Sequence, residues 1–345
     1  MKINQTIFNE ECNSTYIIAE AGLNHNGCLQ TAKKLIDVAV NSGADAVKFQ
    51  KRTVSQLATK DVLDAPDNRF PDFGNTYREI REHIEFGIDE YSQLKIYAED
   101  KNIDFMVTPF DQEAVDFLEN LGVGAYKLAS HSLTNLPLLK YLSTLQKPTI
   151  LSTGMAEYDE IDLAVDIFKK SNCPLSLLHC VSAYPTPFDQ CNLQMIHVLR
   201  KKYDLPIGYS GHELGFLPSV CAVAMGAQII ERHHTLDKSM IGFDHKISLE
   251  PDELSQMITQ IRDVEKIRGT GVKKVSSTEL ITREKYHVSM VLSESINKGS
   301  ILEENMIDYR NPGTGIPPKD AHSIIGKTAK HDILSDVLLN RNMFD

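Results

Sequence analysis

The sequence contains no tryptophan, and only 7% of its 345 residues are aromatic. It also lacks a long apolar run, since no stretch approaches the roughly 20 residues that a membrane-spanning helix needs. The first 12 residues include acidic and polar side chains where a signal peptide would have its apolar core. We therefore expect no membrane association and a cytoplasmic location.

Positive charge is also scarce. The 36 Lys and Arg residues face 47 Asp and Glu residues, which gives a formal net charge of −11. Proteins that bind nucleic acid usually present a basic field to the phosphates, so this composition argues against a nucleic-acid partner. An anionic small substrate would have to be bound by a few basic residues gathered at one site.

The cysteines contain no CxxC pair and do not form the dense framework of a small disulfide-rich domain. We expect reduced thiols instead of disulfides or a zinc site, and assign them no function. The six are Cys12, Cys28, Cys173, Cys180, Cys191 and Cys221.

Hydrophobic residues make up 42% of the chain, enough for a substantial core. Short apolar runs rich in β-branched residues alternate with stretches of helical periodicity, which cover 29–42 and follow residues 89, 112, 135, 158, 192, 213 and 251. About eight such runs, the number that closes a TIM barrel, lie at 16–20, 46–50, 104–108, 125–129, 149–153, 175–180, 206–210 and 228–233. The predicted fold class is therefore an α/β protein with a (β/α)8 barrel.

Two segments interrupt this alternation. Residues 52–88 are polar and contain Pro66, Pro71 and Gly74, which predicts an extended loop over one end of the barrel, a candidate lid. Residues 269–285 are rich in Gly, Lys, Ser and Thr, and short strands are predicted beyond them, near 288–292, 301, 312–318 and 324–337. We therefore expect a catalytic barrel at 1–270, a linker at 271–285 and a small β-rich domain at 286–345. So small a domain rarely stabilises itself, and we expect it to dock on the barrel or on a second subunit.

Polar residues end nearly every predicted strand. Barrel enzymes collect their catalytic groups at the C-terminal ends of strands, so the set marks a candidate active site. Any single Ser or Thr could equally be a solvated strand end. The set comprises Glu20, Lys48, Gln50, Thr108, Lys127, Ser130, Ser152, Thr153, His179, Ser182, Tyr184, Ser210, His212, Glu231 and His233.

Two of these residues, Lys48 and Lys127, lie inside otherwise apolar runs, where a charged side chain must find a partner or a solvated cavity. Lysines supply point charges and hydroxyl groups supply directional donors, so the two lysines and the neighbouring hydroxyls could hold a phosphate and a carboxylate. Phosphoenolpyruvate carries both groups. A structural ion pair with Glu20 or Glu231 is the alternative.

His212 and His233 end successive strands and should project side by side into the barrel mouth. Neutral imidazoles in that arrangement suit one divalent ion with open positions for ligand and water. His25 and His234 are weaker candidates. The first lies in a loop, and the second should point away from the mouth if the strand is regular.

Seven short motifs stand at or just after the predicted strands: AEAGLNHNG (19–27), VKFQ (47–50), AYKLAS (125–130), LSTGM (151–155), LHCVSAYPTP (178–187), GYSGH (208–212) and ERH (231–233). The tail carries DYRNPGTG (308–315). Together and in this order they resemble the N-acetylneuraminate (sialic acid) synthase family over essentially the whole chain. The tail resembles the family's antifreeze-like SAF domain, a β-clip fold.

The resemblance implies condensation of phosphoenolpyruvate with the open-chain aldehyde of N-acetylmannosamine or a related acylated hexosamine. Water is consumed, and the products are phosphate and a nine-carbon 2-keto acid. It also implies Mn²⁺ or Mg²⁺ on His212 and His233, and a domain-swapped homodimer in which Arg310 reaches the partner's barrel. Phosphoenolpyruvate would be bound by Lys48, Thr108, Lys127, Ser130, Ser152 and Ser210, and the sugar and reacting centre by Glu20, Gln50, Tyr184, Asp244 and Arg310.

The sequence departs from the family at two positions. His131 follows the Lys-x-x-Ser motif where relatives often carry an acidic residue, and Ser182 stands where they often carry Asn. The sugar therefore stays open, and a synthase for legionaminic or pseudaminic acid is an alternative. A Schiff-base aldolase using Lys127 is a further alternative. The last alternative is a sugar-binding protein without enzymatic activity. Such a protein would not need both histidines and both lysines at the strand ends.

Overall fold

The computed structural model describes residues 1–3, 6–7 and 14–345. The chain divides into two compact units, Met1–Gly269 and Thr270–Asp345. Among the described residues, no helix is long and apolar enough to cross a membrane. Five cysteines are free thiols, and the sixth, Cys12, lies outside the described residues.

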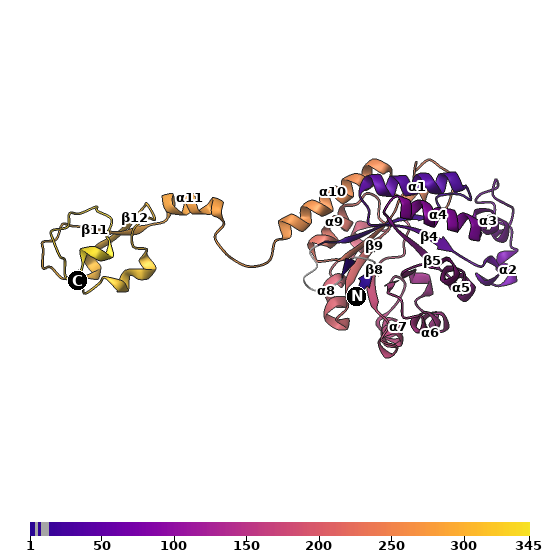
Figure 1. The fold of residues 1–345 in the computed structure, drawn as a ribbon, viewed down its shortest axis with the longest axis horizontal. Coiled ribbons are helices and arrows are strands. Elements are labelled where there is room, and N and C mark those ends of the chain that lie inside the picture. The colour runs from indigo at the N-terminus through magenta and orange to yellow at the C-terminus, as the bar shows by residue number, and fades with distance from the viewer. Residues whose placement is uncertain (4–5, 8–13) are drawn as a thin grey trace. The chain divides into compact units, whose positions relative to one another are not determined.

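Eight parallel strands form the sheet of the first unit, which confirms the predicted barrel (Figure 1). Their order is β5-β4-β3-β10-β9-β8-β7-β6, and β5 and β6 also lie beside each other, so the sheet is a nearly closed barrel. The strands are β3 (Tyr16–Gly22), β4 (Ala46–Lys51), β5 (Asp104–Pro109), β6 (Tyr126–Leu128), β7 (Thr149–Ser152), β8 (Leu175–Cys180), β9 (Ile207–Gly211) and β10 (Ile229–His233). A short hairpin, β1 (Lys2–Ile3) and β2 (Thr6–Ile7), precedes them.

One helix of the outer ring follows each strand. In α1 the buried residues Ala32, Leu35, Ile36 and Ala39 recur at helical spacing and face the sheet, and Gly43 ends the helix at φ 83°, a left-handed conformation that favours glycine. The ring consists of α1 (Leu29–Ser42), α4 (Ile88–Asp100), α5 (Gln112–Leu121), α6 (Leu136–Thr144), α7 (Tyr158–Lys170), α8 (Met195–Tyr203), α9 (Leu217–Ala224) and α10 (Pro251–Arg268).

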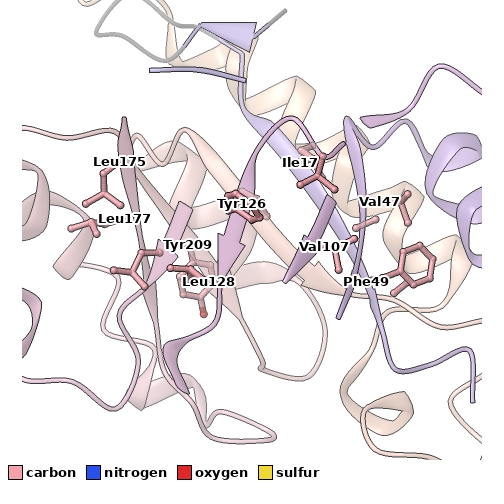
Figure 2. Packing of buried hydrophobic residues seen from close by; sticks show 14 of the residues in the cluster. Ile17, Val47, Phe49, Val107, Tyr126, Leu128, Leu175, Leu177 and Tyr209 are labelled. Carbon is pink, nitrogen blue, oxygen red and sulfur yellow. The ribbon is translucent and has the colours of Figure 1, made fainter. Parts of the chain in front are cut away.

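The core has two layers because successive strand residues point to opposite faces. Ile17, Val47 and Phe49 face outward and pack with the helices in the larger cluster (Figure 2). Their strand neighbours Ile18 and Ala46 face inward and fill the barrel interior together with Tyr16, Met106, Ala125, Ile150, Leu178 and Ile229.

The 52–88 insertion is not only the extended loop that its polar composition predicted. It contains a 3-10 turn (Val54–Gln56) and two helices, α2 (Lys60–Leu63) and α3 (Tyr77–Ile84). Helix α3 begins at Thr76, whose side chain accepts a hydrogen bond from the backbone N–H of Glu79. Its apolar residues Ile80 and Ile84, four positions apart, are buried. A short amphipathic helix of this kind needs only two apolar residues, so its composition resembles that of a loop.

The second unit has its own small core, built from residues such as Met290, Leu292 and Ile324. The segment expected to be a linker contains helix α11 (Ser277–Tyr286), where the carbonyl of Glu284 accepts a hydrogen bond from the N–H of Gly313. Strands β11 (Ser289–Leu292) and β12 (Ile307–Arg310) pair antiparallel, and isolated bridges join 301 with 328 and 296 with 333. The strand expected at 312–318 is absent among the described residues, and β12 forms just before it.

Candidate active site

The strand alternation that fills the barrel interior also positions the polar strand ends. In β10 the inward positions are Ile229, Glu231 and His233, so the same face changes from apolar to ionisable towards the C-terminal end. In β4 the inward series is Ala46, Lys48 and Gln50. These ends surround a cavity of about 260 Å³.

The cavity is lined by every barrel residue assigned to substrate, metal or the reacting centre, whereas the predicted strand ends Thr153 and His179 lie outside it. The predicted residues are Glu20, Lys48, Gln50, Thr108, Lys127, Ser130, Ser152, Ser182, Tyr184, Ser210, His212, His233 and Asp244. The cavity is also lined by residues that the prediction did not assign to substrate, chiefly Arg52, Arg81, Glu231, Phe243 and His131.

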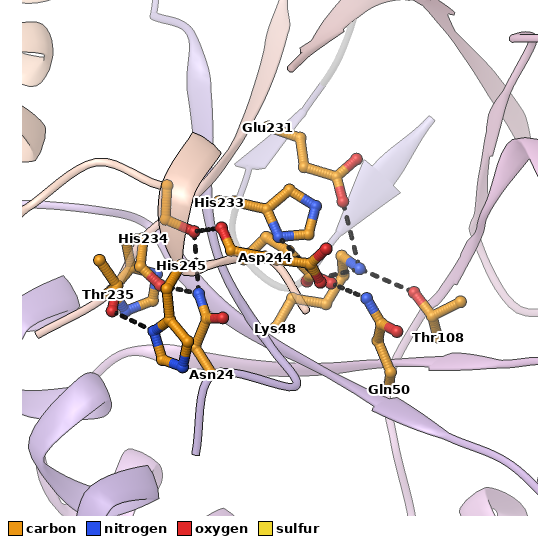
Figure 3. A network of polar contacts seen from close by, with 12 residues as sticks. Asn24, Lys48, Gln50, Thr108, Glu231, His233, His234, Thr235, Asp244 and His245 are labelled. Atoms are coloured by element: carbon orange, nitrogen blue, oxygen red, sulfur yellow. Dashed lines mark hydrogen bonds and ion pairs between the residues drawn. The ribbon is translucent and has the colours of Figure 1, made fainter. Parts of the chain in front are cut away.

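Four buried charges that line the cavity alternate in sign. Figure 3 shows part of this series, where Lys48 contacts Glu231 and Thr108. Lys48 Nζ lies 2.6 Å from Glu20 Oε2 and 3.1 Å from Glu231 Oε1, and Glu231 Oε2 lies 2.9 Å from Lys127 Nζ. Lys48 also donates to Thr108 Oγ1 at 2.7 Å. The ion pairs left open as an alternative for these lysines are therefore present. Because they line the cavity, they do not rule out contact with a substrate.

The ion pairs oppose the effect of burial on the pKa values of Lys48, Glu231 and Lys127. Burial alone would lower the pKa of Lys48, but the carboxylates of Glu20 and Glu231 outweigh it and raise that pKa. Burial would likewise raise the pKa of Glu231, but Lys127 and Lys48 outweigh it and hold that pKa well below its usual range. For Lys127, burial dominates and lowers the pKa, with Glu231 opposing it.

An irregularity in the sheet lies next to Glu20. The register of β3 against β4 shifts between Glu20 and Gly22, and Gly22 has φ +53°. A Cβ atom at position 22 would lie 3.1 Å from Glu20 Oε1 and 3.2 Å from Gln50 Nε2. Gln50 donates to Glu20 Oε1 at 2.5 Å, so glycine leaves room for a hydrogen bond that orients the carboxylate.

Hydroxyl groups line the wall beyond the lysines. Ser130 Oγ accepts a hydrogen bond from the N–H of Gly154 at 2.9 Å. Ser152 Oγ is buried without a hydrogen-bond partner among the residues that the structure describes. Ser182 and Ser210 complete this side of the cavity. A buried hydroxyl without a partner is costly, so Ser152 is suited to receive a ligand atom.

His212 and His233 face each other with ring centroids 5.5 Å apart. The Val181 carbonyl lies 3.1 Å from His212 Nδ1 and requires a donor there, which leaves Nε2 as the free acceptor. Burial, and then His233, lower the pKa of His212 to about 3, so its ring is neutral. His233 Nδ1 is buried without a hydrogen bond in the described part of the chain, 3.9 Å from Asp244 Oδ2.

These two imidazoles fit a divalent ion, because imidazole nitrogens are common ligands of such ions and His233 Nδ1 is buried without a hydrogen bond in the described residues. In residues 1–3, 6–7 and 14–345, no group of three or more His, Cys, Asp and Glu side chains is arranged to hold a metal. An ion held by the two histidines would have open positions for oxygen atoms of substrate or water.

The other histidines have structural surroundings. His25 is buried and stacks on Phe86 with ring centroids 4.2 Å apart. His234 Nε2 contacts the carbonyl of Leu35 in α1 at 3.0 Å, so it points out of the barrel as the strand alternation predicts. His179 Nε2 lies 2.8 Å from the carbonyl of Cys191. Neither His25 nor His234 lines the cavity.

Arg310 belongs to the second unit and ends β12 opposite Ser289. Its guanidinium is half exposed and pairs with Asp336 at 2.6 Å and Asp308 at 3.0 Å. These carboxylates hold the guanidinium at the surface of its own unit.

Three cavity residues could not be assigned to substrate from sequence alone, for different reasons. Glu231 was recognised as a strand end but only as a partner for a lysine. Arg52 lies two residues after Gln50, which lies two residues after Lys48. Strand alternation therefore predicts that Arg52 also points inward, so its place at the cavity could have been found from the sequence. Arg81 comes from α3, and nothing local in the sequence connects that helix with the cavity.

Comparisons with known proteins agree with this geometry. The NeuB family model matches residues 35–273, and the SAF domain model matches residues 287–345. The N,N'-diacetyllegionaminic acid synthase of Campylobacter jejuni is 40% identical, over 94% of this chain and 98% of the relative. Human N-acetylneuraminate-9-phosphate synthase is 37% identical, over 96% and 92%.

Solved structures extend the similarity to the fold. The N-acetylneuraminic acid synthetase of Leptospira borgpetersenii, crystallised with citrate, superposes with a TM-score of 0.70 at 38% identity, covering 81% of this chain and 95% of that one.

Proposed function

This chain belongs to the NeuB family, and we propose that it condenses phosphoenolpyruvate with the open-chain aldehyde of an acylated hexosamine. Water is consumed, and the products are phosphate and a nine-carbon 2-keto acid. The observation that carries the proposal is the pairing of Lys48 and Lys127 through Glu231 in the same cavity as His212 and His233. In this proposal the lysines form an anion site, and the histidines form a neighbouring site that polarises the aldehyde.

Lys48 and Lys127 would bind the phosphate and carboxylate of phosphoenolpyruvate. Each ammonium group contacts a carboxylate that fixes its position, so it would need no reorganisation when the leaving phosphate develops charge. Thr108, Ser130, Ser152, Ser182 and Ser210 would supply directional hydrogen bonds to the same groups.

Glu20 would act at the carbon that loses phosphate. Addition of phosphoenolpyruvate C3 to the aldehyde leaves a cation at C2, which water must attack. The Glu20 carboxylate, oriented by Gln50 and Lys48, can stabilise that cation or take a proton from the water. Tyr184 and Asp244 at the cavity mouth would contact the sugar.

A divalent ion, Mn²⁺ or Mg²⁺, would be held by His212 and His233 and would polarise the aldehyde oxygen. The buried Nδ1 of His233, which has no hydrogen bond among the described residues, supports this assignment. We further propose a domain-swapped homodimer in which Arg310 of one subunit meets the sugar in its partner. The predicted cytoplasmic location stays a prediction.

A Schiff-base aldolase is less well supported. Its lysine must be a neutral nucleophile. Burial lowers the pKa of Lys127, which favours that state, but Glu231 at 2.9 Å favours the ammonium form and would have to be displaced. The second carboxylate pair, at Lys48, has no role in such a mechanism.

The test is a product analysis. Purified protein is incubated with phosphoenolpyruvate, Mn²⁺ and a panel of acylated hexosamines, including the precursors of legionaminic and pseudaminic acids. Phosphate release and mass spectrometry should reveal a 2-keto acid that contains three carbons more than the sugar. Legionaminic acid is the second candidate, because a synthase of that product shares 40% identity with this chain. Absence of a condensation product with every sugar would contradict the proposal.

A further inference from the structure

Two arginines that line the cavity have buried N–H groups that donate to no other described residue. Arg52 follows β4 and is only 7% exposed, and Arg81 lies in helix α3; both line the cavity. Arg52 Nη1 and the Nε and Nη1 atoms of Arg81 are buried without a hydrogen-bond partner in the described residues. Buried guanidinium donors without a partner are costly, so a ligand group is expected to satisfy them.

Aromatic rings and an amide fix the planes of these guanidinium groups. Arg52 lies over Phe110 at 3.8 Å from the ring centroid and donates to Gln50 Oε1 at 2.5 Å. Arg81 lies over Phe243 at 4.1 Å. Stacking holds a guanidinium by its face and leaves its N–H edge available, which is the geometry that binds phosphate.

The nearby carboxylates are engaged elsewhere. Glu85 Oε1 accepts from Lys51 Nζ at 3.0 Å and from the backbone N–H of Arg52, and Asp67 pairs with Arg69. The like charges of Arg52 and Arg81 therefore face the cavity together. Burial and then Arg81 lower the pKa of Arg52 to about 10, a sign that its charge is incompletely compensated.

The position of Arg52 and Arg81 indicates which substrate carries the anionic group that they would bind. Gln50 and Glu20 lie between Arg52 and the lysine at position 48, which is already assigned to phosphoenolpyruvate. Arg81 stacks on Phe243, the residue next to Asp244, on the side assigned to the sugar. The free donors thus belong to the sugar end of the cavity.

We propose that Arg52 and Arg81 bind a phosphate ester at the end of the acylated hexosamine farthest from its aldehyde. This inference rests on the proposed condensation and narrows its sugar to a hexosamine 6-phosphate. Because the three carbons of phosphoenolpyruvate add at C1, the product would carry the phosphate on C9.

The test compares N-acetylmannosamine with its 6-phosphate in the wild-type protein, Arg81→Met and Arg78→Met. Arg78 lies on the same helix but pairs with Asp64 and does not line the cavity, so it is the matched control. The wild type should prefer the 6-phosphate in kcat/KM. Arg81→Met should lower kcat/KM for the 6-phosphate by about 10- to 100-fold, the value of a charged hydrogen bond, and at least ten times more than for the free sugar. Arg78→Met should change neither.

Binding of the 6-phosphate measured by calorimetry gives a readout that does not depend on turnover. It should weaken by a similar factor in Arg81→Met alone. Equal or better turnover of the free sugar by the wild type overturns the inference, and so does a raised KM for phosphoenolpyruvate as the main effect of Arg81→Met. If no sugar is condensed while the 6-phosphate still binds through Arg81, the proposed reaction fails and the anion site stands.

Discussion

The carboxylate of Glu231 bridges Lys48 and Lys127, with one oxygen 3.1 Å from the first ammonium group and the other 2.9 Å from the second. The three residues come from strands β10, β4 and β6, which are far apart in sequence. Glu231 therefore sets the separation of the two lysines that we assign to phosphoenolpyruvate.

Replacing Glu231 with Gln should leave Lys127 buried without its carboxylate. Breaking a buried pair in this way costs about 3–5 kcal/mol, so the melting temperature should fall. The KM for phosphoenolpyruvate should rise, because the lysines lose their fixed spacing. Thermal unfolding and steady-state kinetics check both effects, with Glu82→Gln on the exposed face of α3 as control. Wild-type values in Glu231→Gln would show that the bridge is dispensable.

His212→Ala and His233→Ala should each abolish condensation while leaving the fold intact, because the lost contribution is charge stabilisation in the transition state. Excess chelator should have the same effect, and added Mn²⁺ or Mg²⁺ should reverse it. Circular dichroism monitors the fold, and phosphate release monitors activity. Full activity of the purified protein in excess EDTA would disprove the assignment.

The lysines should act without forming a covalent bond. Borohydride reduction in the presence of substrates should trap no adduct on Lys48 or Lys127. With phosphoenolpyruvate labelled by oxygen-18 in the C–O–P bridge, mass spectrometry should find the label in phosphate. Label retained in the keto acid would mean P–O cleavage and a different mechanism.

Arg310 should act in trans. Arg310→Ala and His233→Ala chains, each inactive alone, should recover activity when co-refolded, because an exchanged dimer contains one intact site of two. The expected value is about half the wild-type activity per heterodimer. Verified heterodimers as inactive as their parents, or a fully active Arg310→Ala protein, would exclude this role.

Arg232 should matter for stability and not directly for chemistry. It points outward from β10 and is buried against Glu213, with Nη1 2.5 Å from Oε1. Arg232→Ala leaves a buried carboxylate without its partner and should lower the free energy of unfolding by about 3–5 kcal/mol. Denaturant titration measures this. An unchanged unfolding midpoint would mean that Tyr209, which donates to Glu213 at 2.9 Å, satisfies the carboxylate alone.

The amino-acid sequence by itself determined the barrel and the position of its reactive end. Strand and helix periodicities are local properties, so all eight strands and the ring helices were predictable. Alternation within a strand is local too. It is why Glu231 and His233 point into the cavity while Arg232 and His234 point away.

Only the tertiary structure decided which of these groups meet. The contacts of Glu231 depend on strands separated by more than 100 residues, and no local pattern specifies such distances. The insertion contributes Arg81 through a short helix with few apolar residues, so its composition predicted a loop. Arg310 ends a strand because β12 pairs with β11, a pairing between segments about 20 residues apart that depends on their packing.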